Sequence, residues 1–200
     1  MNIVIIKYNA GNIESVKNAL SRLGISAEIT ADHDKIRAAD KVIFPGVGEA
    51  STTMAYLRKK GLDKIIISLK QPVLGICLGL QLMCSYSEEN NTTCLGIFEE
   101  EVKRFIPNFG EEFIIKVPHM GWNAIYNLSD KIFSNILEKE YVYFVHSYYA
   151  ALGEHTIATC KYILPFSAAL QKNNFFATQF HPEKSGKLGA EILKNFIALK

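Results

Sequence analysis

The sequence lacks the features that mark metal-binding, disulfide-bonded and membrane-spanning proteins. Its four cysteines, Cys77, Cys84, Cys94 and Cys160, include no C-x-x-C pair, which argues against a zinc site and against a disulfide scaffold. It has no run of about 18 apolar residues, which a membrane-spanning helix would need. The apolar run after Met1-Asn2 is too short for a signal-peptide core. We therefore expect a cytoplasmic protein that uses neither a metal nor a cofactor.

An excess of charge of one sign is also missing. The formal net charge is only +2, which is too small to indicate a nucleic acid or another polyanion as a partner. The chain has no internal repeat, low-complexity segment or convincing linker. With 48% apolar and 21% charged residues, its 200 residues have the composition of an ordinary globular protein. The sequence therefore predicts a single domain over residues 1–200.

The first half of the chain alternates between strand and helix patterns. Apolar residues recur at helical spacing from Ile13 to Leu23, and Gly24 ends that helix. Strands are predicted at residues 3–7, 27–29, 41–44 and 72–74, with further helices around Met54 and Leu57 up to Gly61 and over residues 62–69. Such alternation predicts a parallel sheet that is covered by helices on both faces.

After about residue 95 the pattern changes to short strands and turns. Strands are predicted at residues 94–105, 113–117, 141–146, 157–161, 168–171 and 175–180, before a closing helix over residues 187–199. This half is expected to be antiparallel or mixed. In mostly parallel sheets the chemistry belongs at the carboxyl ends of the strands, and the most informative motifs of this chain follow strands.

The segment G-I-C-L-G-L-Q, residues 75–81, has the pattern of a nucleophile elbow around Cys77. It follows a buried strand, and its small glycines allow a sharp turn into a closely packed helix. In the serine version of this motif the backbone N–H after the nucleophile helps to bind an oxyanion. A helix N-terminus also favours a thiolate over a thiol. The alternative is a small buried core residue, which most unpaired cysteines are.

A base for such a nucleophile is available in His181-Pro182-Glu183, the turn that leaves the strand over residues 175–180. Glu183 could bond to the second imidazole nitrogen, which would hold the tautomer and stabilise the imidazolium. A lone histidine before proline is more often an ordinary turn residue. The pairing with Cys77 at another strand end is what indicates a catalytic triad.

Six motifs together extend over almost the whole chain: residues 8–12 (Y-N-A-G-N), 45–48 (P-G-V-G), 75–81, 116–123 (K-V-P-H-M-G-W-N), 143–148 (Y-F-V-H-S-Y) and 180–185 (F-H-P-E-K-S). With them the chain resembles the class I, triad-type glutamine amidotransferases. The resemblance implies one flavodoxin-like α/β domain with a mixed, mostly parallel sheet and a small antiparallel sheet. It also implies a Cys77, His181 and Glu183 triad that hydrolyses glutamine and supplies ammonia to a synthase. The P-H-M-G-W-N stretch is similar to the branch that serves histidine biosynthesis.

The resemblance assigns further residues to the site. The oxyanion would be bound by backbone N–H groups of Val47 and Leu78, and in similar subunits the peptide at the Val47 position must turn over to do so. Without Cys77, the loop at residues 45–48 would be read as an ordinary glycine-rich turn. The substrate-binding candidates are Gly48, Gln81, Glu89, Ser147 and Tyr148, with Glu88 as the alternative to Glu89 for the α-ammonium group. The alternative for Glu88 and Glu89 is a solvated surface, which is usual for an acidic pair after a helix. The alternative for Ser147 and Tyr148 is a core position, because they follow a strand rich in aromatic residues.

The P-H-M-G-W-N segment combines the only tryptophan with polar residues, a composition suited to an interface. The resemblance implies that it faces a (β/α)8-barrel cyclase or synthase subunit, with which the chain forms a heterodimer. The candidate interface residues are Asn12, His119, Met120, Trp122, Tyr143 and Lys184. The alternative is that Trp122 merely covers a small strand layer.

Several functions are compatible with these motifs. The preferred one is a glutaminase subunit that supplies ammonia in histidine biosynthesis. Related subunits supply ammonia for amidination of surface-polysaccharide or flagellin sugars, and they share the catalytic motifs. A free-standing cysteine hydrolase would not need the P-H-M-G-W-N surface. A non-catalytic interaction subunit would be expected to have lost a triad residue, and this chain keeps all three.

Overall fold

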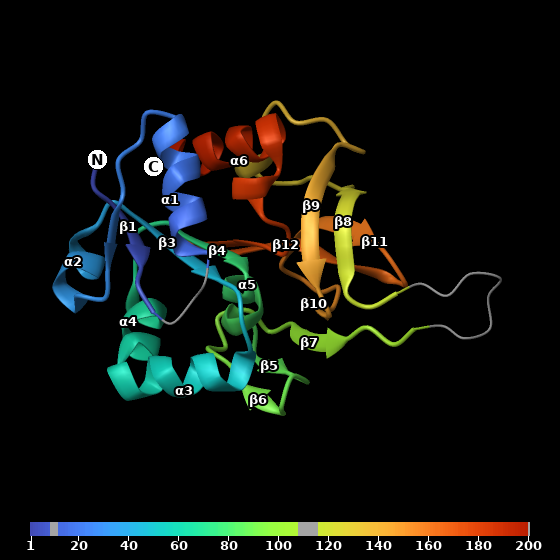
Figure 1. The fold of residues 1–200 in the computed structure, drawn as a ribbon, viewed down its shortest axis with the longest axis horizontal. Helices are drawn as coiled ribbons and strands as arrows, with labels where there is room; N and C mark the ends of the chain where they lie inside the picture. Colours follow the sequence, from blue (N-terminus) through green and yellow to red (C-terminus); the bar gives the residue numbers. More distant parts are fainter. Residues whose placement is uncertain (9–11, 108–115, 200) are drawn as a thin grey trace.

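The main element of the computed structural model, which describes residues 1–8, 12–107 and 116–199, is a seven-stranded sheet (Figure 1). Its strand order is β11-β12-β13-β4-β3-β1-β2. Five neighbouring strands are parallel: β1 (Ile3–Ile6), β2 (Glu28–Thr30), β3 (Lys41–Gly46), β4 (Val73–Cys77) and β13 (Phe175–Thr178). β11 (Thr156–Lys161) and β12 (Pro165–Lys172) extend the sheet in antiparallel pairing. The predicted mixed, mostly parallel sheet is confirmed.

Helices cover both faces of this sheet, as the alternating pattern predicted. On one face α1 (Ile13–Arg22) and α6 (Gly186–Ala198) pack against alternate residues of β1 such as Ile3 and Ile5. On the other face lie α2 (His33–Ala38), α3 (Ala50–Lys60), α4 (Leu62–Ser68) and α5 (Leu78–Met83), against Val4 and Ile6. Because successive strand residues point to opposite faces, one fully apolar strand supplies both cores.

Two smaller sheets complete the molecule, where one had been expected. One has the order β10-β7-β5-β6, with β5 (Tyr86–Ser87), β6 (Thr92–Thr93), β7 (Glu101–Arg104) and β10 (Tyr148–Ala150). It is not purely antiparallel, because β5 and β7 pair in parallel. The other is the antiparallel pair of β8 (His119–Ala124) and β9 (Tyr141–His146). Short 3-10 turns lie at Lys131–Phe133 and Pro182–Lys184.

Several details differ from the sequence prediction, including the short strands β5, β6 and β10, which were not predicted. Of residues 94–105 only β7 is a strand, because the backbone N–H groups of Leu95 and Ile97 bond instead to the end of α5. The strand predicted at residues 113–117 lies mostly outside the described residues, and the observed strand begins at His119. The short helix α2, which is capped by the Asp32 side chain, was not predicted.

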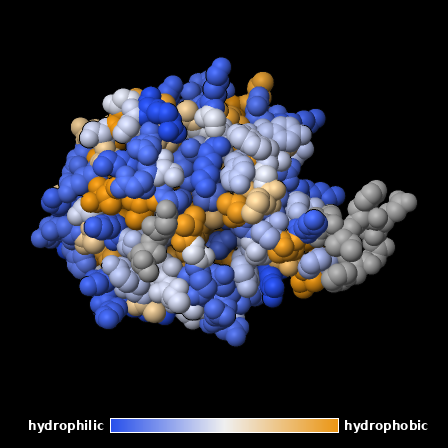
Figure 2. All heavy atoms as spheres, viewed as in Figure 1, coloured by the Kyte–Doolittle hydropathy of each residue, from blue (hydrophilic) through white to orange (hydrophobic). Residues whose placement is uncertain are grey.

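The strand register brings three chain segments together at the carboxyl ends of neighbouring strands in the large sheet. Gly46 at the end of β3 pairs with Cys77 at the end of β4, and Thr178 at the end of β13 pairs with Ile76. Figure 2 shows hydrophilic residues over most of one face of the molecule, with apolar residues gathered in a few patches. Among the described residues, no helix is both long and apolar enough to cross a membrane.

Candidate active site

Cys77 occupies a sharp turn between β4 and α5. Its backbone has φ 53° and ψ −104°, a conformation that non-glycine residues rarely adopt and that marks strained functional turns. A Cβ atom on Gly79 would overlap the backbone carbonyl oxygen of Phe44 in β3, so only glycine lets α5 pack this closely. The structure therefore has the strand, turn and helix geometry predicted for residues 75–81.

His181 and Glu183 form a buried pair directly after β13. The imidazole Nδ1 lies 2.8 Å from Glu183 Oε1, and both side chains are inaccessible to solvent. Since an ionised carboxylate only accepts, Nδ1 carries the proton. His181 Nε2 is buried and has no hydrogen-bond partner among the described residues. This leaves Nε2 available for proton transfer at Cys77.

The pKa of His181 depends on Cys77 and Glu183 as well as on burial. Burial by itself would lower this pKa, but the charge of Cys77 and the Glu183 carboxylate raise it to about 10. At neutral pH the proton therefore stays on the imidazole, next to a cysteine sulfur. A thiolate and imidazolium pair is the activated form of a cysteine nucleophile.

Residues from distant parts of the chain hold the histidine and the glutamate in place. Asn12, at the start of α1, donates from Nδ2 to Glu183 Oε1 at 3.0 Å. Ser185 donates to the His181 carbonyl at 2.7 Å and accepts from the Tyr143 N–H at 3.0 Å. Asn12 had been expected at a partner interface. It is buried instead, and its side chain orients the glutamate of the predicted triad.

A cavity of about 330 Å³ lies beside Cys77. The predicted oxyanion residues Val47 and Leu78 both line it. So do all five predicted substrate-binding residues, Gly48, Gln81, Glu89, Ser147 and Tyr148. These residues come from four separate segments of the sequence, and the fold brings them together. The remaining lining residues are Pro118, Val145 and His146.

The structure distinguishes between the two neighbouring acids. Glu89 lines the cavity, and its Oε2 accepts from the Ala50 N–H at 2.7 Å. Glu88 accepts from the Arg104 N–H at 2.7 Å and lines a different cavity. Burial raises the pKa of Glu89, and the nearby Glu49 charge adds to this, against the opposing effect of the Ala50 N–H. A cationic ligand group beside Glu89 would reverse that shift and would itself be stabilised.

Two residues beside Cys77 were missed by the sequence analysis. Gln179 is fully buried and donates from Nε2 to the Cys77 sulfur at 3.7 Å, while its Oε1 accepts from Gln81 at 3.1 Å. The Tyr8 hydroxyl donates to the Pro45 carbonyl and thereby holds the loop that precedes Val47. Burial, together with the charge of Cys77, raises the pKa of Tyr8. A polar residue at the end of an apolar strand was the signal that could have identified Gln179.

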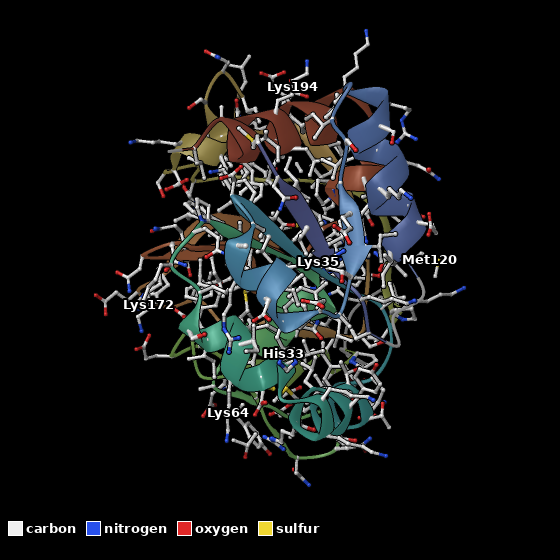
Figure 3. All side chains as sticks on the ribbon, turned by 90° about the vertical axis from the view of Figure 1, so that its left-hand side faces the viewer. His33, Lys35, Lys64, Met120, Lys172 and Lys194 are labelled. Atoms are coloured by element: carbon white, nitrogen blue, oxygen red, sulfur yellow. The ribbon has the colours of Figure 1, made fainter. Side chains whose placement is uncertain are left out.

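The β8 and β9 pair has one exposed face and one buried face. Met120 and Trp122 are 63% and 55% exposed, and Figure 3 shows Met120 projecting away from the ribbon. The Trp122 and Tyr143 rings lie 6.1 Å apart, and Lys184 Nζ is 5.9 Å from the centre of the Tyr143 ring. His119 is only 3% exposed. His119 had been predicted at the partner interface; it is buried instead, since β8 turns alternate side chains inward.

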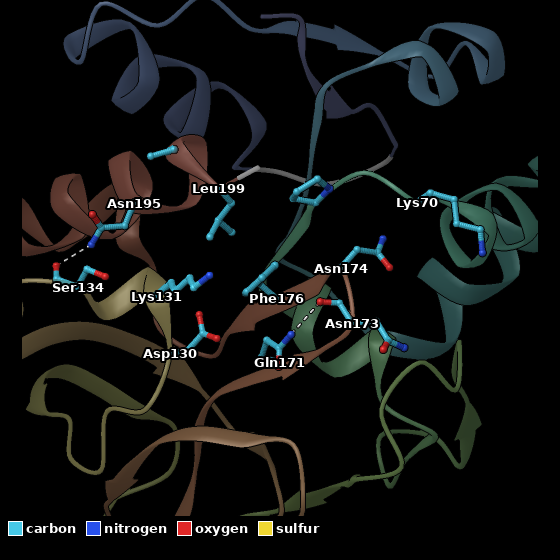
Figure 4. A pocket seen from close by; sticks show the side chains of 12 residues that line it. Lys70, Asp130, Lys131, Ser134, Gln171, Asn173, Asn174, Phe176, Asn195 and Leu199 are labelled. Carbon is cyan, nitrogen blue, oxygen red and sulfur yellow. Dashed lines mark hydrogen bonds between the residues drawn. The ribbon is translucent and has the colours of Figure 1, made fainter.

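A second cavity, of about 730 Å³, lies at the amino ends of the parallel strands, opposite Cys77 (Figure 4). Pro72 and Phe176 near the amino ends of β4 and β13 line it. The Asn174 amide in this cavity is used within the protein, because it donates to the Leu69 and Gln71 carbonyls. Within the described residues, Glu99, Glu100 and His155 are the one group whose metal-ligating atoms lie within 4.8 Å of one another, and none of them lines the Cys77 cavity.

Comparison with known families agrees with this geometry. The family model described as "Glutamine amidotransferase class-I" matches residues 4–199. The chain belongs to this family. It is thus a glutamine amidotransferase, and the family implies the Cys-His-Glu triad.

Several curated relatives carry one name. The chain is 60% identical over 199 residues to "Imidazole glycerol phosphate synthase subunit HisH" of Bacteroides fragilis (strain YCH46), covering 100% of both chains. It is 44% identical over 201 residues to the subunit of that name in Escherichia coli (strain K12), again covering 100% of both. A solved glutamine amidotransferase structure superimposes with a TM-score of 0.72 at 20% identity, covering 97% of this chain and 96% of that one. That likeness concerns the fold alone.

Proposed function

We propose that the chain is the glutaminase subunit of an imidazole glycerol phosphate synthase. It hydrolyses glutamine to glutamate and ammonia. It then passes the ammonia to a (β/α)8-barrel subunit that makes imidazole glycerol phosphate and AICAR in histidine biosynthesis. The observation that carries the proposal is the His181 and Glu183 pair beside the Cys77 elbow, in a cavity lined by Gln81 and Glu89. The two curated relatives described above support the choice of synthase.

The reaction follows from the positions of the three triad residues. The Cys77 thiolate attacks the side-chain amide carbon of glutamine, so that a C–S bond forms and the carbonyl electron pair moves onto oxygen. His181 gives its Nε2 proton to the amide nitrogen, the C–N bond breaks, and ammonia leaves a thioester behind. Neutral His181 then takes a proton from water, and the resulting hydroxide attacks the thioester. Collapse of the second tetrahedral state releases glutamate and restores the thiolate.

The oxyanion formed in both steps needs two donors. The Leu78 N–H at the start of α5 is one of them, and the Val47 N–H is the other when its peptide points into the cavity. Gly46 and Gly48 flank Val47, and Gly48 already has a φ of +134°, so a change in the peptide orientation is sterically permitted. Losing one such donor typically costs about 10²- to 10³-fold in rate. A partner that turns this peptide would therefore control the reaction.

Substitution of Cys77 by alanine tests the proposal. Cys77→Ala is expected to abolish glutamine hydrolysis while circular dichroism and binding of the barrel subunit stay unchanged. In the wild-type protein, an alkylating glutamine analogue is expected to label Cys77 alone. All four cysteines are buried, but burial raises the pKa of Cys84, and that of Cys94 and of Cys160 to about 12.

Mass spectrometry of the labelled peptides reads out this experiment, and Cys160→Ala is the matched control. Label on Cys84, Cys94 or Cys160 in place of Cys77 would refute the assignment, as would normal turnover by Cys77→Ala. The identity of the synthase is tested separately by finding which barrel protein purifies with the chain. If the barrel protein modifies a sugar, the chain would be assigned to the related polysaccharide or flagellin pathway.

A further inference from the structure

A continuous chain of hydrogen bonds runs from β8 to the Cys77 cavity through four side chains and one backbone carbonyl. Asn123 Nδ2 lies 3.3 Å from His119 Nε2, and His119 Nδ1 lies 3.0 Å from His146 Nε2. His146 Nδ1 lies 2.7 Å from the Tyr148 carbonyl oxygen. The same oxygen accepts from Gln81 Nε2 at 2.8 Å. We call Asn123, His119, His146 and Gln81, with the Tyr148 carbonyl, the relay.

The chemistry of the acceptors fixes the direction of every bond in the relay. A backbone carbonyl only accepts, so His146 Nδ1 carries a proton and its Nε2 accepts. His119 must then donate from Nδ1, which leaves its Nε2 as the acceptor for the Asn123 amide. For the same reason Gln81 directs its Nε2 toward Tyr148 and Gln179. Its carbonyl oxygen is left to accept from a ligand in the cavity.

Packing keeps this arrangement neutral and rigid. The His119 ring is stacked between Tyr162, 4.0 Å away, and Phe144, 4.7 Å away. Burial lowers the pKa of His146 to about 3 and the pKa of His119 to about 4, so neither ring carries a charge at neutral pH. A protonated ring would place two donors against each other between the histidines. The neutral relay therefore has one stable pattern of donors and acceptors.

The two faces of β8 connect this relay to the outer surface. His119 is buried and Asn123 half-buried, while the intervening Met120 and Trp122 are exposed. Any partner that packs on Met120 and Trp122 must act on the β8 backbone, which also carries His119 and Asn123. At the other end, His146 and Gln81 line the cavity that contains Cys77.

We propose that His119 and His146 are positioning residues that orient the Gln81 amide for glutamine and link that orientation to the placement of β8. This proposal rests on the proposed function, since it assigns glutamine to the Cys77 cavity. Neither histidine belongs to the predicted triad. Their effect passes through the Tyr148 carbonyl and Gln81, whose carbonyl oxygen accepts a proton donor of the substrate.

Two substitutions of His119 separate the hydrogen bond from the packing. His119→Phe keeps a ring between Tyr162 and Phe144 but removes the donor to His146. His119→Asn keeps a donor near the Nδ1 position but removes the ring. His119→Phe is expected to raise the KM for glutamine about tenfold, with a smaller change in kcat, because one hydrogen bond to a buried acceptor is lost. His119→Asn is expected to retain a KM closer to that of the wild-type protein.

The matched control is Tyr162→Phe, which removes a hydrogen bond to the Lys116 carbonyl beside the relay and keeps the ring on His119. Its KM and its stimulation by the barrel subunit are expected to be those of the wild-type protein. His119→Phe is expected to lose part of that stimulation. If His119→Phe keeps the normal KM and stimulation while His119→Asn loses them, ring packing is what matters and the proposal is overturned.

The ring tautomers provide a readout that packing alone would not set. In the wild-type chain, ¹H–¹⁵N correlation spectra of the histidine rings are expected to show the Nδ1–H form for both His119 and His146 at neutral pH. The Nε2–H form at either residue would contradict the relay. This measurement needs no turnover, so a chain without glutaminase activity would disprove the proposed function and still leave the relay tested.

Discussion

At the scale of single residues, four buried cysteines have very different surroundings. Burial raises the pKa of the Cys84, Cys94 and Cys160 thiols. Cys77 instead lies at the end of a strand, next to an imidazole that keeps its proton at neutral pH. Burial favours the neutral thiol, whereas a neighbouring cation favours the thiolate. The reactive cysteine is therefore identified by its neighbour.

The pKa of His181 is expected to fall in Cys77→Ala. The charge of Cys77 raises this pKa, burial lowers it, and Glu183 alone remains to oppose burial in the variant. His181 is therefore expected to hold its proton to about pH 10 in the wild-type chain and to lose it at lower pH in the variant. A histidine ring titration followed by NMR measures both values. Equal pKa values in the two proteins would show that Cys77 does not act on His181.

At the scale of secondary-structure elements, the packing of α5 against β3 and β4 decides the geometry of the elbow. A Cβ atom on Gly75 would approach the Met83 sulfur and the Gly79 backbone, and one on Gly79 would overlap the Phe44 carbonyl. Strand β4 is flanked by β3 and β13, so neither neighbour can move aside without breaking ladder hydrogen bonds. The turn at Cys77 is thus held by packing on both sides.

Gly79→Ala is expected to lower the free energy of unfolding by about 3 kcal/mol, the upper part of the usual range for overpacking, because backbone atoms must shift. Gly24→Ala is the control. No atom lies within 4 Å of a Cβ at Gly24, and only its left-handed φ of +74° disfavours alanine, which costs about 1 kcal/mol. Chemical denaturation of both variants measures the difference. A smaller loss for Gly79→Ala than for Gly24→Ala would contradict the packing argument.

At the scale of the whole molecule, the cavity beside Cys77 and the exposed β8 face are adjacent. Pro118, directly before β8, and Val145, within β9, both line the cavity beside Cys77. His181 donates its backbone N–H to the Tyr143 carbonyl at 2.9 Å, so β9 also supports the histidine of the predicted triad. A partner on this face would therefore contact the two strands that border the site.

The isolated chain is expected to hydrolyse glutamine slowly, and its rate is expected to rise about 10²- to 10³-fold when the barrel subunit and its ligand are added, because the Val47 donor is then in place. Steady-state glutamate production with and without partner measures this rise. An isolated chain with full activity, unchanged by the partner, would favour the free-standing hydrolase.

Trp122→Ala is expected to reduce the synthase product formed per glutamine consumed more than it weakens glutamine binding. Trp122 is exposed, packs on Tyr143 and is not a residue of the predicted triad, so its loss would open the subunit junction to water without removing a reacting group. Parallel measurement of glutamate and synthase product tests this. A variant that still forms one product for each glutamate, with normal stimulation by the partner, would show that Trp122 only covers the β8 and β9 pair.

The sequence by itself predicted the layered fold and the elements that carry the triad, because those features are local. Apolar runs, helical spacing and glycines around Cys77 act over a few residues, and they lead to the same strand, turn and helix that the structure contains. The resemblance likewise pointed to Gln81 and Glu89, which do line the cavity. Short elements such as α2 were missed because six residues carry too little periodic pattern.

Only the tertiary structure decided which side chains face inward and which polar groups meet. Asn12 and Glu183 are far apart in the chain, and nothing in either segment indicates their hydrogen bond. His119 belongs to a motif with the composition of an interface, yet strand alternation turns its ring into the core toward His146. Hydrogen bonds between distant segments depend on how the sheets pack and on their register. A one-residue change in register would turn these side chains to the opposite face.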